Sequence, residues 1–124
     1  MGENIRVLII DDHELIREAI KDCMAGLSCS FIEAQNEQEA LNEISVGKFD
    51  IIFLDLGLPE ADGLETLKKA KQMRPNLAPV VVLTAYHDDG RRRNAEELGI
   101  LDYLTKDNLS VKEVTRVIAM ALKS

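Results

Sequence analysis

Residues 50–67 read DIIFLDLGLPEADGLETL, and this stretch decides how the rest of the chain is interpreted. It begins with the short apolar run DIIFL, residues 50–54, which we interpret as a buried strand. Asp55 follows that strand directly. Further on, Asp62 with Glu65 three residues beyond it forms a pattern that caps the beginning of a helix. The stretch therefore predicts a strand, an acidic residue at its carboxyl end, and a helix that runs to about residue 73.

The same alternation of short apolar runs and amphipathic stretches extends in both directions along the chain. Toward the N-terminus, residues 5–10 (IRVLII) form a continuous run rich in β-branched residues, which is typical of a strand buried on both faces. Further strands are expected at residues 28–33, 80–83 and 101–104. Helical spacing, capping pairs and a glycine at position 99 predict helices over residues 15–24, from Asn36 on, over 62–73, over 89–98 and from Ser110 on.

This order of elements is (βα)5, which predicts an α/β protein with a doubly wound, five-stranded parallel sheet. Each crossover between parallel strands is right-handed and returns over the sheet, so helices are expected on both of its faces. The 124 residues suit one compact domain, which we place over residues 1–124. In open sheets of this kind the functional crevice lies beyond the carboxyl ends of the strands.

Composition and charge argue against several classes of function. The formal net charge of −7 argues against direct nucleic-acid binding by this domain. No apolar run approaches the roughly 20 residues of a membrane-spanning helix, and the N-terminus lacks the basic start and apolar stretch of a secretory signal. A cytoplasmic location without membrane contact is therefore expected. Cys23 and Cys29 form no metal-binding pattern and are expected to be reduced, in or near the core.

Polar residues with reactive side chains stand at the carboxyl ends of the predicted strands. Asp11 and Asp12 follow the first strand, Asp55 the third, Thr84 the fourth and Lys106 the fifth. Three carboxylates in one crevice repel one another, and a divalent cation is the natural remedy. Oxygen-only ligands favour Mg²⁺, which keeps several waters and accepts a phosphate oxygen as a further ligand. A lysine beside such an ion suits phosphoryl transfer, in which a metal and a cation neutralise the equatorial oxygens.

Four motifs, each at a predicted strand end, carry a resemblance to a known family. They are VLIIDDHELIR, DIIFLDLGLPEADGLETL, VVVLTAY and LDYLTK, in this order. With these motifs the sequence resembles the response-regulator receiver family of two-component signal transduction over essentially its whole length. The resemblance implies a flavodoxin-like, CheY-like receiver fold with strand order 2-1-3-4-5. It also implies a phosphoacceptor switch, which is not an enzyme beyond its own phosphorylation and dephosphorylation.

The resemblance further assigns roles around the expected cation. Asp55 is expected to be the phosphoacceptor, and Lys106 to pair with it and later with a phosphoryl oxygen. Asp12, Asp55 and the backbone carbonyl of Gly57 are expected to coordinate Mg²⁺ directly, with Asp11 acting through water. The implied phosphodonor is a histidine kinase or a histidine phosphotransfer protein.

Other residues are implied to bind the phosphoryl group or to respond to it. The hydroxyl of Thr84 is expected to donate a hydrogen bond to a phosphoryl oxygen. Ala85, through its backbone N–H, and Leu56 complete the phosphate-binding set. Thr84 then shifts toward the phosphate while Tyr103 rotates inward, which changes the surface of the fourth helix, fifth strand and fifth helix. That surface is the expected site of output to an attached domain or downstream protein, and of a phosphorylation-linked homodimer.

The sequence also departs from the family pattern. Asp107 follows Lys106 where many members have proline, so the loop after the fifth strand is expected to be looser. The pair Lys106-Asp107, together with residues 11–13 (DDH), resembles a branch of the family that often carries a C-terminal DNA-binding domain. The chain is then either cut from a longer regulator or a domain that works alone. His13 is expected to be exposed and without a role in phosphotransfer, and residues 91–93 to be a solvated basic helix face.

Two alternatives to the phosphorylation switch stay open. The first is a phosphate-independent, receiver-like protein-binding module, which keeps the fold but never accepts phosphate. The complete set of reactive residues at the strand ends argues against it. The second is a Mg²⁺-dependent phosphohydrolase, one class of which needs a second acid two residues after its nucleophile, where this chain has Gly57.

Overall fold

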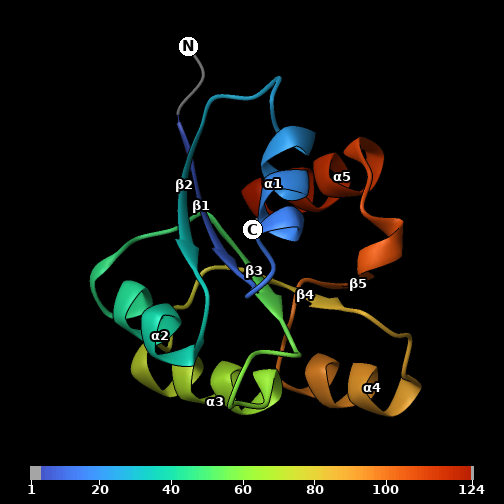
Figure 1. Ribbon diagram of the computed structural model, residues 1–124. Coiled ribbons are helices and arrows are strands. Elements are labelled where there is room, and N and C mark those ends of the chain that lie inside the picture. The colour runs from blue at the N-terminus through green and yellow to red at the C-terminus, as the bar shows by residue number, and fades with distance from the viewer. Residues whose placement is uncertain (1–3, 124) are drawn as a thin grey trace.

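The computed structural model describes residues 4–123 and shows a central parallel sheet with helices packed on both faces (Figure 1). The strands are β1 (Ile5–Ile10), β2 (Cys29–Ala34), β3 (Ile51–Asp55), β4 (Val80–Thr84) and β5 (Asp102–Thr105). The helices are α1 (Glu14–Cys23), α2 (Glu37–Val46), α3 (Gly63–Met73), α4 (Asp89–Glu97), the short 3-10 helix η1 (Lys106–Asn108) and α5 (Val111–Leu122). None of these helices is long and apolar enough to cross a membrane.

The strand order is β2-β1-β3-β4-β5 and every pairing is parallel, which confirms the predicted (βα)5 topology. β1 pairs with β2 on one side and with β3 on the other, so the strand order reverses between them. The register places Ile10 beside Leu54 and Leu54 beside Val82. The carboxyl ends of the three central strands therefore meet at one edge of the sheet, next to the point where a functional crevice is expected.

The strands are buried on both faces because successive side chains point to opposite sides of the sheet. In β1, Val7 and Ile9 pack in the core under α1 and α5, whereas Leu8 and Ile10 pack in the core under α2, α3 and α4. These four residues are at most 1% exposed. Figure 1 shows the same arrangement, with α1 and α5 on one face and the other three helices on the opposite face. Two filled cores thus hold the strands that carry the loops at the carboxyl edge.

Most predicted boundaries lie within one residue of those in the structure. β1 lies as predicted, and Gly99, with a φ of 82°, follows α4 as expected of a glycine after a helix. β2, β3 and β5 each begin and end one residue later than predicted, and β4 continues to Thr84. The reason is that pairing with the neighbouring strand sets a strand's end: Asp55 pairs with Leu83, and Thr84 with Thr105.

The predicted capping residues begin their helices, but two of the three capping pairs are incomplete. The side chains of Asn36, Asp62 and Ser110 accept hydrogen bonds from backbone N–H groups of the first turn. Glu65 and Glu113, which the sequence places as the second half of two boxes, instead pair with basic residues one turn further along their own helices. In α2, by contrast, Glu39 accepts a hydrogen bond from the backbone N–H of Gln35 at 2.9 Å, so both members of that pair bond backbone N–H groups at the helix start.

Glu60, in the loop between β3 and α3, has a φ of 60° and is the one non-glycine residue in the described chain with a positive φ. Glycine adopts this left-handed region without strain. We expect Glu60→Gly to raise the free energy of unfolding by up to about 1 kcal/mol, because relief of strain exceeds the entropy that glycine adds to the unfolded chain. Urea unfolding of both proteins measures the difference, and a less stable variant would contradict the expectation.

Candidate functional site

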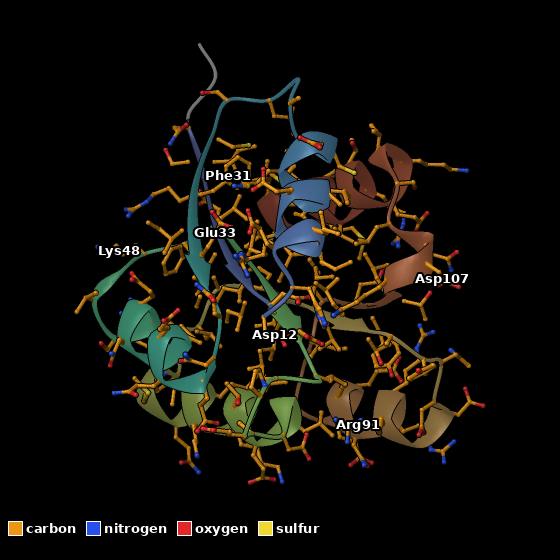
Figure 2. All side chains as sticks on the ribbon, viewed as in Figure 1. Asp12, Phe31, Glu33, Lys48, Arg91 and Asp107 are labelled. Carbon is orange, nitrogen blue, oxygen red and sulfur yellow. The ribbon has the colours of Figure 1, made fainter. Side chains whose placement is uncertain are left out.

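The reactive residues predicted at the strand ends converge on one edge of the sheet. Asp55 is the last residue of β3, Thr84 the last of β4, and Lys106 begins η1 directly after β5. These three residues line one open cavity of about 340 Å³. Figure 2 shows Asp12 at the same edge, just beyond the end of β1. Asp55, Thr84 and Lys106 therefore share a crevice as the sequence predicts, and a carboxylate oxygen of Asp12 lies within 4.8 Å of one of Asp55.

Two buried carboxylates share one ammonium group at the centre of this crevice. Nζ of Lys106 lies 2.9 Å from Oδ2 of Asp11 and 3.1 Å from Oδ2 of Asp55. Asp11 is fully buried and Asp55 is 2% exposed. Charges removed from water are unfavourable unless they are paired. One lysine compensates only one of these two charges, and Asp12 brings a third carboxylate close to them.

The pKa values of Asp55 and Lys106 reflect this excess of negative charge. Burial raises the pKa of Asp55, and the charge of Asp11 raises it further. The backbone N–H of Gly57, which donates to Oδ1 of Asp55 at 2.9 Å, and the ammonium of Lys106 act in the opposite direction without cancelling the rise. Burial acts to lower the pKa of Lys106, but attraction to the two carboxylates exceeds it, so that this pKa is raised. Lys106 is thus a firmly held cation in a site that favours additional positive charge.

Three carboxylates form a donor set that fits a small divalent cation. We call this set, Asp11, Asp12 and Asp55, the acidic site. One oxygen from each carboxylate, together with a ring nitrogen of His13, lies within 4.8 Å of the others. Oδ1 of Asp12 is buried and accepts no hydrogen bond from the described protein. Carboxylate oxygens and excess negative charge are what Mg²⁺ requires of a protein. The residues present therefore fit this ion.

The loop after β3 packs tightly behind Asp55 because α3 begins with glycine. The N–H of Gly63 donates to the carbonyl of Leu56 at 3.0 Å. A Cβ atom on Gly63 would lie 2.4 Å from Cα of Leu56 and 2.8 Å from the carbonyl oxygen of Asp55. Both are backbone atoms, which cannot move aside as the end of a flexible side chain can. Glycine at this position therefore allows α3 to approach the backbone segment that carries Asp55.

The expected phosphate-binding residues of β4 line the cavity, but the threonine hydroxyl has another partner. Oγ1 of Thr84 donates a hydrogen bond to the carbonyl of Tyr86 at 2.9 Å. Ala85, between them, is exposed and lines the same cavity as Asp55. The hydroxyl of Thr84 must therefore leave the carbonyl of Tyr86 before it can donate to a group bound at Asp55.

Leu56 lies next to Asp55, as predicted, but its backbone N–H does not face the cavity as a free donor. It donates to the carbonyl of Leu83 at 3.0 Å, because the pairing between β3 and β4 extends one residue beyond Asp55. The N–H of Gly57 instead points at the Asp55 carboxylate. A backbone contact to a group on Asp55 is thus available from Gly57, whereas a contact from Leu56 requires that its bond to Leu83 be shared or broken.

Tyr103 lies in the core beneath α4. It is 5% exposed, and the guanidinium carbon of Arg92 lies 5.6 Å from its ring centroid, within the range of a cation–π contact. Tyr103 is thus already buried while the hydroxyl of Thr84 bonds to the carbonyl of Tyr86.

The hydroxyl of Tyr103 is buried without a hydrogen-bond partner in the described protein. A buried hydroxyl without a partner loses its hydration on folding and gains no hydrogen bond in return, and phenylalanine avoids that cost. We therefore expect Tyr103→Phe to leave the free energy of unfolding unchanged or to raise it by about 1 kcal/mol. Urea unfolding measures the effect, with Tyr86→Phe as the control because Tyr86 is 81% exposed. A clear loss of stability in the Tyr103 variant alone would show that its hydroxyl has a partner in solution.

Arg17 of α1 supports the site although the sequence does not predict it. Its Nη1 donates to the carbonyl of Asp11 at 2.7 Å, and its Nε donates to Glu33 at 2.7 Å. The side chain is 9% exposed, so both bonds are shielded from water. Arg17 thereby connects α1 with the ends of β1 and β2. The available signal was its position one turn before Ile20, on the buried face of the helix.

The basic residues 91–93 are not the uniform solvated face that the sequence predicts. Arg91 lines the cavity and forms an ion pair with Asp62, at the beginning of α3, with Nη2 and Oδ1 2.9 Å apart. Figure 2 shows Arg91 on α4, on the same side of the sheet as α3. Arg92 contacts the ring of Tyr103, and only Arg93 of the three is exposed. Packing between helices distant in sequence accounts for this difference.

Comparison with known proteins identifies the family. A family model described as the response regulator receiver domain matches residues 7–119. The KDP operon transcriptional regulatory protein KdpE of Escherichia coli (strain K12) is 36% identical over 100 residues, which cover 81% of this chain and 44% of that protein. A protein-glutamate methylesterase/protein-glutamine glutaminase of Archaeoglobus fulgidus is 34% identical over 116 residues, which cover 91% of this chain and 33% of that protein. The chain thus spans between a third and a half of the length of these two relatives.

Solved structures agree with this assignment. The receiver domain of the Francisella response regulator 1452 is 30% identical, with a TM-score of 0.84, and the match covers 97% of this chain and 98% of that chain. A response regulator from Burkholderia pseudomallei, solved with a phosphorylated aspartic acid, a calcium ion and citrate, is 25% identical, with a TM-score of 0.82. That match covers 96% of this chain and 69% of the other. Because the family model spans nearly the whole chain, this protein belongs to the response regulator receiver domain family of two-component signalling.

Proposed function

We propose that this receiver domain is a Mg²⁺-dependent switch in which Asp55 accepts a phosphoryl group from a histidine of a histidine kinase or phosphotransfer protein. The observation that carries this proposal is the position of the Asp55 carboxylate, which is almost fully buried yet lines an open cavity beside Lys106. A nucleophile held in this way attacks without first being ordered. The phosphorylated aspartic acid in the related protein from Burkholderia pseudomallei supports the same chemistry.

In the proposed reaction a carboxylate oxygen of Asp55 forms a bond to phosphorus. The bond between phosphorus and the donor imidazole nitrogen breaks, and its electron pair stays with the imidazole. Phosphoryl transfer requires positioning and charge neutralisation more than covalent assistance from the protein. Lys106, 3.1 Å from Asp55, is placed to neutralise a phosphoryl oxygen. We assign the backbone contacts with that group to the N–H groups of Gly57 and Ala85.

The acidic site, with the carbonyl of Gly57, is proposed to hold Mg²⁺. When bound there, this ion supplies positive charge beside the transferring oxygens, which one lysine alone does not balance. Oδ1 of Asp12 and Oδ2 of Asp11 are both buried without a hydrogen-bond partner in the described protein, but Oδ2 of Asp11 faces the ammonium of Lys106, so Asp12 is the ligand more available to the ion. Asp11 is held by Lys106 and by the backbone N–H of His13, which donates to Oδ1 at 2.8 Å. This difference supports a direct contact for Asp12 and a water-mediated one for Asp11.

We propose that the conformational change that transmits the signal begins in the loop between β4 and α4. The phosphoryl group carries about −1.5 to −2 charges where the Asp55 carboxylate carries −1, and its oxygens attract the hydroxyl of Thr84 away from the carbonyl of Tyr86. That loop leads into α4, which contacts Tyr103 through Arg92. The phosphoryl group thereby favours one of two pre-existing arrangements of the face formed by α4, β5 and α5. An attached domain, a downstream protein or a second copy of the chain is the proposed reader of that face.

Intact-mass spectrometry after incubation with acetyl phosphate tests the proposal. We expect the wild-type protein to gain the mass of one phosphoryl group in the presence of Mg²⁺, and no gain in Asp55→Asn or when Mg²⁺ is removed with EDTA. Asp50→Asn serves as the matched control, because Asp50 precedes the other end of β3 and is exposed. It should gain the phosphoryl group as the wild type does. No gain in a folded, Mg²⁺-bound wild-type protein would instead favour a phosphate-independent binding module.

A further inference from the structure

His13 brings a nitrogen donor to the acidic site. Its Nδ1 lies 3.3 Å from Oδ1 of Asp11 and 3.3 Å from Oδ1 of Asp12. The side chain is 64% exposed, so the ring lies at the mouth of the site and not in the core. The sequence prediction of an exposed His13 is thus met, but the prediction leaves out the direction of the ring, which points back at the two carboxylates.

The four candidate ligand atoms lie nearly as close together as the ligands of one ion. One atom each from Asp11, Asp12, His13 and Asp55 lies within 4.8 Å of the others. Around an ion with bonds of about 2.0–2.2 Å, ligand atoms are separated by no more than roughly twice that length. Separations of up to 4.8 Å slightly exceed this limit, so binding requires small side-chain adjustments. The exposed imidazole can make such an adjustment freely.

The chemistry of the donor set determines which ions gain from His13. Mg²⁺ prefers oxygen ligands and keeps several waters, so an imidazole adds little to its binding. Zn²⁺ and its first-row neighbours bind imidazole well. Among the divalent first-row metals, the later ones bind nitrogen and oxygen sites more tightly than Mn²⁺ and Fe²⁺ do. The unpartnered oxygen of Asp12 lies beside the imidazole and provides a carboxylate ligand for the same ion.

We propose that His13 makes the acidic site a binding site for first-row transition-metal dications, with Nδ1 of His13, Asp12 and Asp55 as ligands. The proposal rests on the metal site of the proposed function and adds a selectivity to it. Zn²⁺ gains a nitrogen ligand that Mg²⁺ does not use, so the two ions compete for one site with different dependence on His13. The identity of the bound ion thereby becomes a second input to the site, alongside the phosphodonor.

The chain offers a matched control for this proposal. His87, the other histidine, lies beyond β4 and contacts Asp89 through Nε2 at 2.8 Å, and it is 59% exposed. Each histidine thus has a comparable exposure and a neighbouring carboxylate, but only His13 belongs to the four-residue cluster. His13→Ala is expected to fold normally, because His13 makes no side-chain hydrogen bond that caps α1.

Calorimetric titration with Zn²⁺ and with Mg²⁺, without any phosphodonor, tests the proposal on wild type, His13→Ala and His87→Ala. We expect His13→Ala to weaken Zn²⁺ binding about tenfold or more, as loss of a metal-supporting side chain does. Mg²⁺ binding by the same variant should stay near that of the wild type, and His87→Ala should change neither affinity. In ¹⁵N spectra of the wild type, Zn²⁺ should shift the Nδ1 resonance of His13 and leave that of His87 in place.

Three results would overturn this assignment. They are an unchanged Zn²⁺ affinity in His13→Ala, an equal loss of Zn²⁺ affinity in both histidine variants, and an equal loss of Zn²⁺ and Mg²⁺ affinity in His13→Ala. The last would show that His13 acts on the charge or shape of the site and not as a ligand. None of these results depends on phosphorylation, so failure of this inference is distinguishable from failure of Asp55 to accept a phosphoryl group.

Discussion

Replacing Lys106 with methionine is expected to lower the free energy of unfolding by about 3 kcal/mol when divalent cations are absent, as does removal of one partner from a buried ion pair. Methionine keeps an unbranched, flexible side chain in the same space, so the change removes mainly the ammonium group. Asp11 and Asp55 then face each other without the cation that lies 2.9 and 3.1 Å from them. Their mutual repulsion is present only in the folded protein, and the variant is therefore less stable.

Mg²⁺ should restore part of this stability, because an ion bound at the acidic site replaces the lost positive charge and binds the folded state alone. Urea unfolding in EDTA and in Mg²⁺ measures both effects. Lys112→Met is the control, since Lys112 lies exposed on α5 and does not line the cavity at Asp55. The free energy of unfolding of this control variant should be close to that of the wild type in both EDTA and Mg²⁺. Equal stability of the Lys106 and Lys112 variants in EDTA would contradict the ion-pair account of the site.

The second large effect is expected for Gly63→Ala. The added methyl group would lie 2.4 Å from Cα of Leu56, closer than non-bonded carbon atoms approach, so α3 or the backbone after β3 must shift. We expect a loss of about 3 kcal/mol in the free energy of unfolding, at the upper end of the usual range for inserting an atom into a packed core. Because the displaced backbone carries Asp55, phosphorylation by acetyl phosphate should slow as well, even at a temperature where the variant is folded.

Gly26→Ala provides the matched control for that experiment. A Cβ atom on Gly26 meets nothing within 4 Å, and the one described glycine with a positive φ is Gly99. Alanine at position 26 should therefore leave stability unchanged or raise it slightly by restricting the unfolded chain. Urea unfolding and the rate of phosphorylation are measured for both variants. If Gly63→Ala were as stable as Gly26→Ala, α3 would not lie as close to the Asp55 backbone as the structure shows.

The sequence predicts the fold and the meeting of the reactive residues well because both follow from local patterns. Apolar runs such as IRVLII indicate buried strands, and parallel strands bring their carboxyl ends to one edge whatever the side chains are. The proximity of Asp11, Asp55 and Lys106 therefore required no knowledge of individual side-chain contacts. Strand ends were missed by one residue because pairing with a neighbouring strand, and not the apolar run, determines them.

The remaining features depend on contacts between residues far apart in the chain. The ion pair of Arg91 with Asp62 spans 29 positions and forms because α3 and α4 are neighbours on the sheet. The bond from Leu56 to Leu83 depends on how far the β3–β4 pairing extends. The burial of Tyr103 under Arg92 is likewise a result of packing. No periodicity or capping signal within a single element carries such information.

The most direct test of the account asks which of three neighbouring acids becomes phosphorylated. After reaction with acetyl phosphate and Mg²⁺, borohydride reduces an acyl phosphate of aspartate to homoserine, and peptide sequencing by mass spectrometry locates the reduced residue. We expect reduction at Asp55, since its carboxylate lines the cavity beside Lys106. Asp11 and Asp12 should remain unmodified in the same sample. Reduction at Asp11 or Asp12, or at none of the three in protein that binds Mg²⁺, would contradict the assignment of Asp55 as the phosphoacceptor.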